Sequence, residues 1–233
     1  MNALKKTARI AGFWYLLMGI CSGFSMMYVD SKLYVPGDAA ATVSKILASE
    51  RLFRLGIVFN IVGQIAFLFL ALALYKLFKA VDRDQARLMV ILIVASVPIA
   101  CLDMLNQYVP ILLLSNAGYL SAFEPAQLNA LAMVFLDMHK QGYFIAEFFW
   151  GLWLFPFGLL MFKSGFMSKT LGVLLMAGCF GYLGECLVIF LFPGHKAMSD
   201  PGIAIAALAE ISSILWLLIK GVKDPKTAVV KAD

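Results

Sequence analysis

The sequence predicts an all-α fold, a membrane bundle of six transmembrane helices forming one domain over residues 1–233. Of the 233 residues, 62% are hydrophobic and 14% are charged, whereas a soluble domain is about 45–50% apolar and about 25% charged. The apolar residues also gather into segments of the roughly 20 residues that a helix needs to cross about 30 Å of hydrocarbon. These observations exclude a soluble enzyme, a disordered chain and a nucleic-acid-binding module.

The six apolar segments follow one another with short breaks. Lipid offers no hydrogen-bond partners to backbone groups, so segments of this length are expected to be helices rather than strands. The predicted spans are residues 10–29, 54–76, 88–114, 142–162, 169–192 and 202–220. The breaks between them carry proline, glycine or charge, at Val35-Pro36-Gly37-Asp38, at residues 79–87, at Phe123-Glu124-Pro125, at Lys163-Ser164-Gly165 and at Phe192-Pro193-Gly194.

The first span begins with basic residues, as a signal peptide does. Its apolar run continues past Cys21 to Val29 without a small-residue cleavage site, so a retained helix is predicted. Residues 39–52 carry apolar side chains at helical spacing and are predicted to form a short helix along the membrane surface or capping the bundle. Residues 125–141 contain no helix breaker and are expected to extend the fourth helix outward, and Pro156 is expected to kink that helix.

The distribution of positive charge predicts an orientation. Cationic residues of short loops tend to stay on the cytoplasmic side. With the N-terminus inside, thirteen Lys and Arg fall on the inner side and six on the outer side. The sequence therefore predicts that both termini face inward, and this accounts for the net charge of +5 without an acidic partner.

Ionisable and amide side chains lie within the predicted spans, where they are costly and usually face the bundle interior. In each helix these residues follow one side at i, i+3 or i+4 spacing. At 1.5 Å per residue they lie roughly 7–15 Å from the outer end of their spans. The sequence therefore predicts an outward-opening pocket above a sealed apolar inner half. Its predicted lining is Asp103, Glu147, Glu185, Glu210, Asn60, Gln64, Asn106 and Gln107, with Arg54 and His139 at the rim.

The charge balance of this pocket leaves two interpretations open, besides a purely structural one. No Lys or Arg lies well inside a span, and buried carboxylates without counter-charges take up protons. The acids are therefore either neutral and hydrogen-bonded to the amides, or the pocket holds a cation. In the structural interpretation the same side chains only tie helices together.

Three function classes follow from these interpretations. The leading one is binding or transport of a small ligand or cation in the pocket. The second is a membrane-embedded, metal-dependent hydrolase, in which His139 and the acids Asp137, Glu147 or Glu185 hold a metal and its activated water. The third is a non-catalytic scaffold or accessory protein.

No cofactor is predicted, because the sequence contains no P-loop, GxSxG, HExxH or GxGxxG motif and only two histidines. The expected partner is the lipid bilayer, without nucleic acid, and the oligomeric state stays open. The four cysteines lie in apolar runs without a CxxC spacing, so they are expected to act as small buried hydrophobes.

Glycines and one repeated motif carry further information about packing. Gly12, Gly19 and Gly23 in the first helix, and Gly178 and Gly181 on the stripe of Glu185, predict close approach of neighbouring helices. The motif A-E-x4-L-W-L occurs at residues 146–154 and again at residues 209–217, which makes a parallel duplication conceivable.

Three stretches resemble one known family. They are residues 154–182, the opening Ala8-Arg9-Ile10-Ala11-Gly12-Phe13-Trp14-Tyr15-Leu16, and Glu210 with Leu215-Trp216-Leu217. Together they resemble the bacterial domain of unknown function 4386 family over nearly the whole chain. The resemblance implies a multi-pass protein of the bacterial inner membrane and carries no activity over to these residues.

Overall fold

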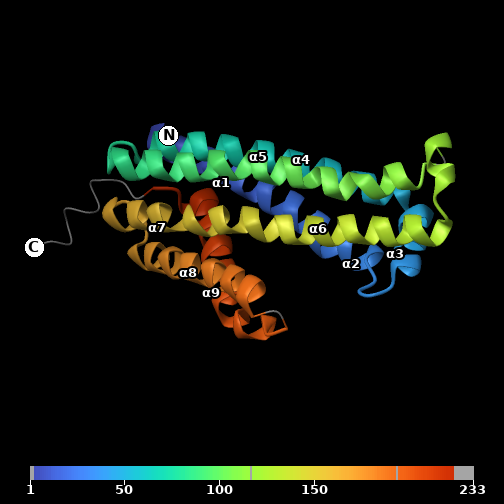
Figure 1. The fold of residues 1–233 in the computed structure, drawn as a ribbon. Coiled ribbons are helices and arrows are strands. Elements are labelled where there is room, and N and C mark those ends of the chain that lie inside the picture. The colour runs from blue at the N-terminus through green and yellow to red at the C-terminus, as the bar shows by residue number, and fades with distance from the viewer. Residues whose placement is uncertain (1–2, 116, 193, 223–233) are drawn as a thin grey trace, which may run out of the picture. The chain divides into compact units, whose positions relative to one another are not determined.

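The computed structural model describes residues 3–115, 117–192 and 194–222, and within these ranges it contains helices and turns but no strand (Figure 1). Six of the helices are long and apolar enough to cross a membrane. The all-α class and the six apolar spans are thereby confirmed. Pro193 and the predicted inner lysines Lys223, Lys226 and Lys231 lie outside the described residues.

The first span is longer than predicted, because α1 (Ala3–Gly23) continues through the π-helical segment η1 (Phe24–Asp30) into α2 (Ser31–Leu33). A short helix follows, α3 (Ala39–Ala48), capped by the Asp38 carboxylate, which accepts the backbone N–H of Ala41 at 2.8 Å. The prediction of a helix to residue 52 is wrong at its end. Ser49 leaves the helical conformation, with φ −134° and ψ 38°, and Leu52 belongs to the next helix.

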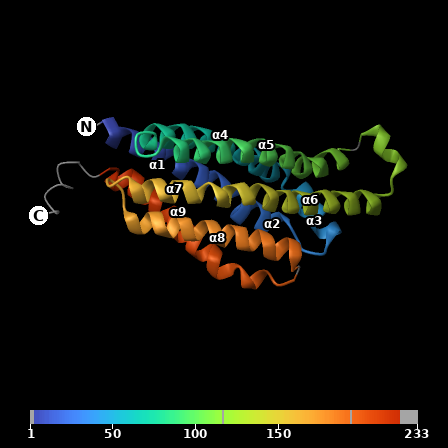
Figure 2. The same ribbon diagram turned by 60° about the vertical axis from the view of Figure 1, so that its left-hand side comes forward.

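Helices α4 (Glu50–Phe78) and α5 (Arg83–Leu113) run side by side as a hairpin (Figures 1 and 2). The charged run 79–87, predicted to separate two helices, is itself partly helical. α5 begins within it, because Asp82 caps the helix by accepting the Gln85 N–H at 3.1 Å and its charged first turn can remain in water.

After the short 3-10 turn η2 (Gly118–Ala122), α6 (Pro125–Leu152) and α7 (Leu154–Lys163) form one apolar stretch of 39 residues. This confirms the predicted helical extension over residues 125–141. The α-helical pattern is interrupted at Trp153, where Pro156 has no N–H to donate to the carbonyl of Leu152.

Helices α8 (Lys169–Leu191) and α9 (Asp200–Leu215) complete the chain, with the short η3 (Lys196–Met198) before α9 and the π-helical η4 (Trp216–Lys220) after it. The predicted turn after Lys163 is confirmed, with Gly165 at φ +70°. Figures 1 and 2 show α7, α8 and α9 packed side by side. The backbones approach closely at Gly158 with Gly172 and at Gly181 with Gly202.

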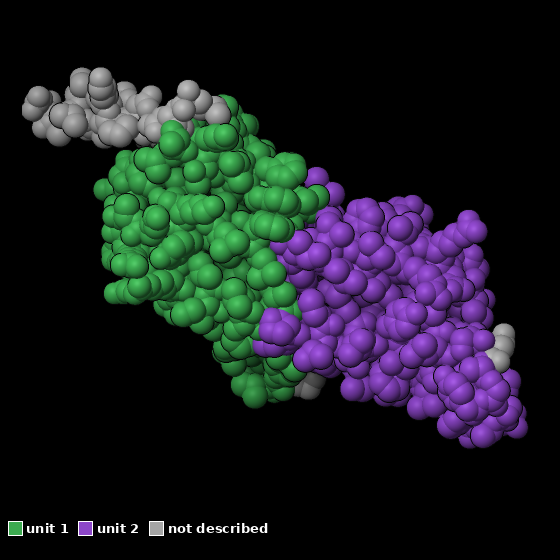
Figure 3. Space-filling model, turned by 90° about the horizontal axis from the view of Figure 1, so that it is seen from above, with its two compact units in different colours: residues 1–17, 66–97, 145–233 green, residues 18–65, 98–144 purple. Residues whose placement is uncertain are grey.

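The contacts group the chain into two compact units, coloured in Figure 3. Unit 1 contains residues 1–17, 66–97 and 145–233, and unit 2 contains residues 18–65 and 98–144. The single domain over 1–233 stays a prediction, since α1, α4, α5 and α6 each contribute residues to both units. The core of unit 1 is aromatic, with fully buried Tyr15, Trp153 and Phe157 and a Trp153–Phe157 ring distance of 5.2 Å. Unit 2 has an aliphatic core that includes Val29, Ile46 and Ile111.

Candidate functional site

The residues predicted to line one pocket are divided between the two units. Unit 1 contains Glu147, Glu185 and Glu210, and unit 2 contains Asn60, Gln64, Asp103, Asn106 and Gln107 together with Arg54 and His139. The single shared pocket stays a prediction.

Within unit 1, Glu147 on α6 and Glu185 on α8 lie beside one another, and we call them the glutamate pair. The two residues are only 3% and 5% exposed. Glu147 Oε2 has no hydrogen-bond partner among the described residues. Glu185 Oε1 lies 3.4 Å from the ammonium of Lys196 in η3, whose side chain is 57% exposed. Among the described residues, one partly solvated ammonium group therefore lies beside two buried carboxyl groups.

Close packing of α6 against α8 brings the glutamate pair together. A Cβ built on Gly151 would lie 2.7 Å from the Cβ of Tyr182, so the two helices meet there with no room for a larger residue. Glu147 is one helical turn before Gly151, and Glu185 is one turn after Tyr182. Because residues three and four apart share a helix face, both carboxyl groups emerge beside this contact.

The third acid of unit 1, Glu210 on α9, lies next to the hydroxyl groups of Tyr15 and Tyr182. Tyr15 comes from α1 and is fully buried. Glu210 is also within electrostatic range of Glu147. Three of the acids selected from the sequence thus lie in the same part of unit 1.

Tyr15, Tyr182 and Lys196 are neighbours of these acids that were not among the predicted site residues. Tyr182 stands three residues before Glu185, so helical spacing could have indicated it. Lys196 could be found only from the structure, because its loop position fixes no helical face.

In unit 2, Asp103 on α5 pairs with His139 on α6. Asp103 Oδ2 lies 2.7 Å from His139 Nδ1, and the side chains are 7% and 16% exposed. The Asn106 amide donates to Asp103 Oδ1 at 3.3 Å. A Cβ on Gly142 would collide with the Asp103 carboxylate, so glycine at this position of α6 makes room for the pair. His139, predicted at a rim, is therefore a direct partner of Asp103.

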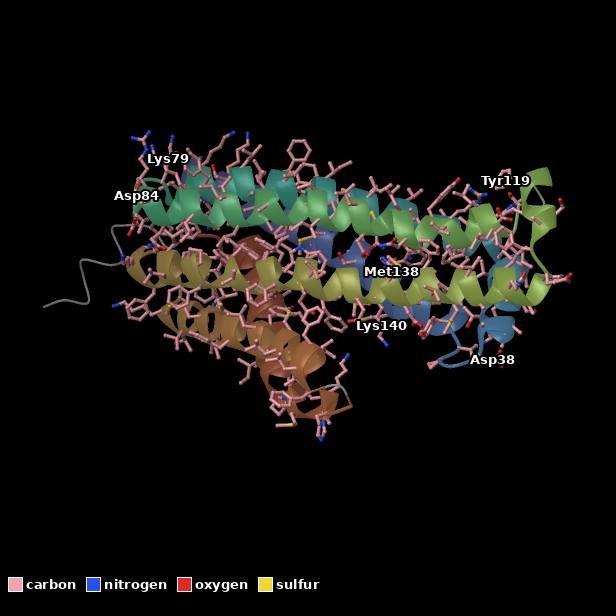
Figure 4. All side chains as sticks on the ribbon, in the orientation of Figure 1. Asp38, Lys79, Asp84, Tyr119, Met138 and Lys140 are labelled. Atoms are coloured by element: carbon pink, nitrogen blue, oxygen red, sulfur yellow. The ribbon has the colours of Figure 1, made fainter. Side chains whose placement is uncertain are left out.

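A second polar contact of unit 2 lies just beyond the first apolar helix. The Tyr34 hydroxyl donates to Asp137 Oδ1 at 2.8 Å, and the Lys140 ammonium lies 5.9 Å from the centre of the Tyr34 ring. Figure 4 labels Lys140 on α6. Burial, together with the hydrogen bond to Asp137, raises the pKa of Tyr34 to about 12.

The remaining predicted residues of unit 2 have different surroundings. Arg54 is exposed, forms an ion pair with Glu50 at 2.6 Å and lies over the ring of Tyr108. Gln107 is 1% exposed and neither its amide oxygen nor its amide nitrogen has a partner among the described residues. Gln64 is 8% exposed and its amide oxygen also lacks one. Asn60 is partly exposed on α4.

The ligand set of the predicted metal hydrolase is not assembled in the described part of the chain. Within that part, no three His, Cys, Asp or Glu residues are grouped so as to hold a metal ion. Asp137 binds Tyr34, His139 pairs with Asp103, and Glu147 lies beside Glu185. Three of the four cysteines are buried, as expected, whereas Cys101 is exposed on α5.

Comparison with known proteins identifies a family. A family model described as a domain of unknown function (DUF4386) matches residues 10–221. No curated protein and no solved structure matches the chain.

Proposed function

The chain belongs to the domain of unknown function 4386 family, and from the geometry of the glutamate pair we propose that it binds or transports a small cation, or a proton, at these two residues. The observation that supports this most directly is the unequal charge count at Glu147 and Glu185. Two nearly fully buried carboxyl groups lie together, and one partly solvated ammonium stands beside them.

The charge count leaves one carboxylate to be neutralised. Removing a carboxylate from water costs several kcal/mol unless it gains a counter-ion or a proton. Lys196 supplies one positive charge to Glu185, and Glu147 Oε2 is left without a partner among the described residues. A monovalent cation, an organic ammonium group or a proton would complete the site.

The membrane setting belongs to the same proposal. The protein would lie in the bacterial plasma membrane with both termini inside. The glutamate pair would then lie in the outer half of the bilayer and exchange its ligand with the outer aqueous side.

The test is thermal unfolding of the purified protein in lipid nanodiscs while Na⁺, K⁺ or methylammonium is raised at pH 8 and constant ionic strength. A ligand that binds only the folded state stabilises it by about 2.7 kcal/mol at a hundredfold excess over Kd. We expect at least one of these cations to raise the Tm of the wild type. Glu147→Gln and Glu185→Gln should each abolish that rise.

The matched control is Glu124→Gln, which removes an exposed acid in the turn before α6 and should keep the wild-type response. A proton as the ligand predicts a different pattern, in which no cation shifts the Tm and unfolding at pH 8 releases a proton, a release that Glu147→Gln eliminates. If neither cations nor protons couple to unfolding in the wild type, the proposal is wrong and the pair only holds helices together.

A further inference from the structure

The pairing of Asp103 with His139 in unit 2 has no place in the function proposed for the glutamate pair. His139 Nδ1 and Asp103 Oδ2 are 2.7 Å apart, which is an ion-pair distance, although the imidazole is not aligned for a hydrogen bond to a described residue. Asn106 donates to the other oxygen of the carboxylate. Both partners of the ion pair are mostly shielded from solvent, with the histidine side chain 16% exposed.

Gly142 of α6 leaves the space that the Asp103 carboxylate of α5 occupies. It lies one turn after His139, and any side chain there would displace the Asp103 carboxylate. One turn further along α5, Gln107 is almost fully buried with both amide atoms unpartnered among the described residues. The apolar helices therefore enclose a polar region around the ion pair rather than an isolated contact.

The charges around His139 favour a positively charged imidazole. Asp103 faces the ring from α5, and Asp30, at the end of η1, lies within electrostatic range of it. On its own helix, Asp137 is hydrogen-bonded to Tyr34, while Lys140 lies over the ring of that tyrosine. Two carboxylates thus act on one imidazole from two different elements.

From this geometry we infer that Asp103 and His139 form a proton-binding site, in which His139 holds a proton beside the Asp103 carboxylate and within electrostatic range of Asp30. The proton ties η1, α5 and α6 together by charge. When it leaves, the imidazole becomes neutral and the contact with Asp103 loses its charge assistance. The site is distinct from the glutamate pair, since none of its residues belongs to unit 1.

The low histidine content makes the proton directly observable. His139 and His195 are the two histidines of the chain, and His195 is exposed in the loop after α8. In a His195→Gln protein labelled with ¹⁵N-histidine, the ring nitrogens report on His139 alone. We expect both nitrogens to have the chemical shifts of imidazolium at pH 7. A neutral imidazole at pH 7 would overturn the inference.

Two further variants separate proton binding from simple packing. Asp103→Asn keeps the shape of the side chain and removes its charge, so it should convert His139 to the neutral form at pH 7. Asp30→Asn should also lower the midpoint pH of the His139 titration, by a smaller amount than Asp103→Asn does. Glu124→Gln is the matched control and should leave the spectrum unchanged. A titration of His139 that is identical in Asp103→Asn and in the control would also overturn the inference, and the spectrum of the His195→Gln protein decides even if Asp103→Asn fails to fold.

Discussion

Tyr34 illustrates how one side chain outside the apolar helices fixes a neighbour by hydrogen bonding. Its hydroxyl donates a hydrogen bond to Asp137, and the ammonium of Lys140 lies over its ring. The raised pKa means that the folded protein favours the neutral phenol more strongly than the unfolded chain does. The stabilisation is therefore fully present below pH 10 and is lost as the pH rises through about 12.

Tyr34→Phe should remove this stabilisation. The hydrogen bond is worth about 1 kcal/mol, so we expect the variant to unfold at a lower temperature than the wild type at pH 8. The difference should shrink as the pH rises from about 10 to about 12, because the wild type then loses the same bond. Thermal unfolding of both proteins across this range measures it, and a difference that is constant with pH would contradict the assignment.

The acids of unit 1 and those of unit 2 differ in how well the sequence predicts them. Helical spacing marks Glu147, Glu185 and Glu210 as inward-facing, and they do lie near one another. The same reasoning cannot predict that Asp103 meets His139, because the rotation of α5 against α6 depends on Gly142 and on packing between distant parts of the chain. The contact of Lys196 with Glu185 depends on a loop conformation that periodicity does not encode.

At the scale of elements, glycines determine how closely helices pack in unit 1. Gly178 of α8 faces Ala206 of α9, and Gly181 meets the backbone of Gly202. The predicted stripe of small residues on α8 therefore packs against α9. In α1, a Cβ built on Gly12 would lie 2.9 Å from Leu218, so the chain packs closely at this glycine as predicted. A Cβ built on Gly23 would have no atom within 4 Å, so the predicted close approach is absent there.

Gly181→Ala and Gly184→Ala form a matched pair on α8. At Gly181 a Cβ would collide with the carbonyl of Gly202, and overpacking of this kind costs about 1–3 kcal/mol. At Gly184 a Cβ meets nothing within 4 Å, and alanine favours a helix over glycine by about 0.5–1 kcal/mol. We expect a lower Tm for Gly181→Ala and an unchanged or higher Tm for Gly184→Ala. Equal changes in Tm in the two variants would contradict the close approach of α8 and α9 at Gly181 and Gly202.

The repeated motif A-E-x4-L-W-L coincides with helix irregularity in both copies. The α-helical pattern is interrupted at Trp153, and the π-helical η4 begins at Trp216. Pro156 explains the first of these but has no counterpart after Trp216. The parallel duplication stays a prediction.

At the scale of the whole molecule, the exposed surface of the helices is apolar along their length. Large side chains such as Phe13, Ile91, Leu102, Phe180 and Ile219 are each more than half exposed. A monomeric soluble protein rarely exposes contiguous apolar area of this extent. Composition alone predicts this property, which is why the fold class could be derived reliably from the sequence, whereas the helix ends at Ser49 and Arg83 depended on local capping and charge.

The predicted orientation can be tested with single cysteines at opposite ends of α5. Lys79 precedes this helix and Tyr119 follows it, and both side chains are exposed and labelled in Figure 4. In a Cys101→Ser background the other native cysteines are buried. In intact cells, an impermeant maleimide should label Tyr119→Cys and should label Lys79→Cys only after the cells are opened. The reverse pattern would place the termini outside.

The length of the helical stretch from Pro125 to Lys163 has a consequence for imaging. Its 39 residues correspond to about 58 Å of helix measured along the chain, at 1.5 Å per residue. The hydrocarbon layer is about 30 Å thick, so this stretch contains more helix than one perpendicular crossing needs. In electron micrographs of nanodisc particles, density from the excess turns is therefore expected outside the hydrocarbon layer or at its surface.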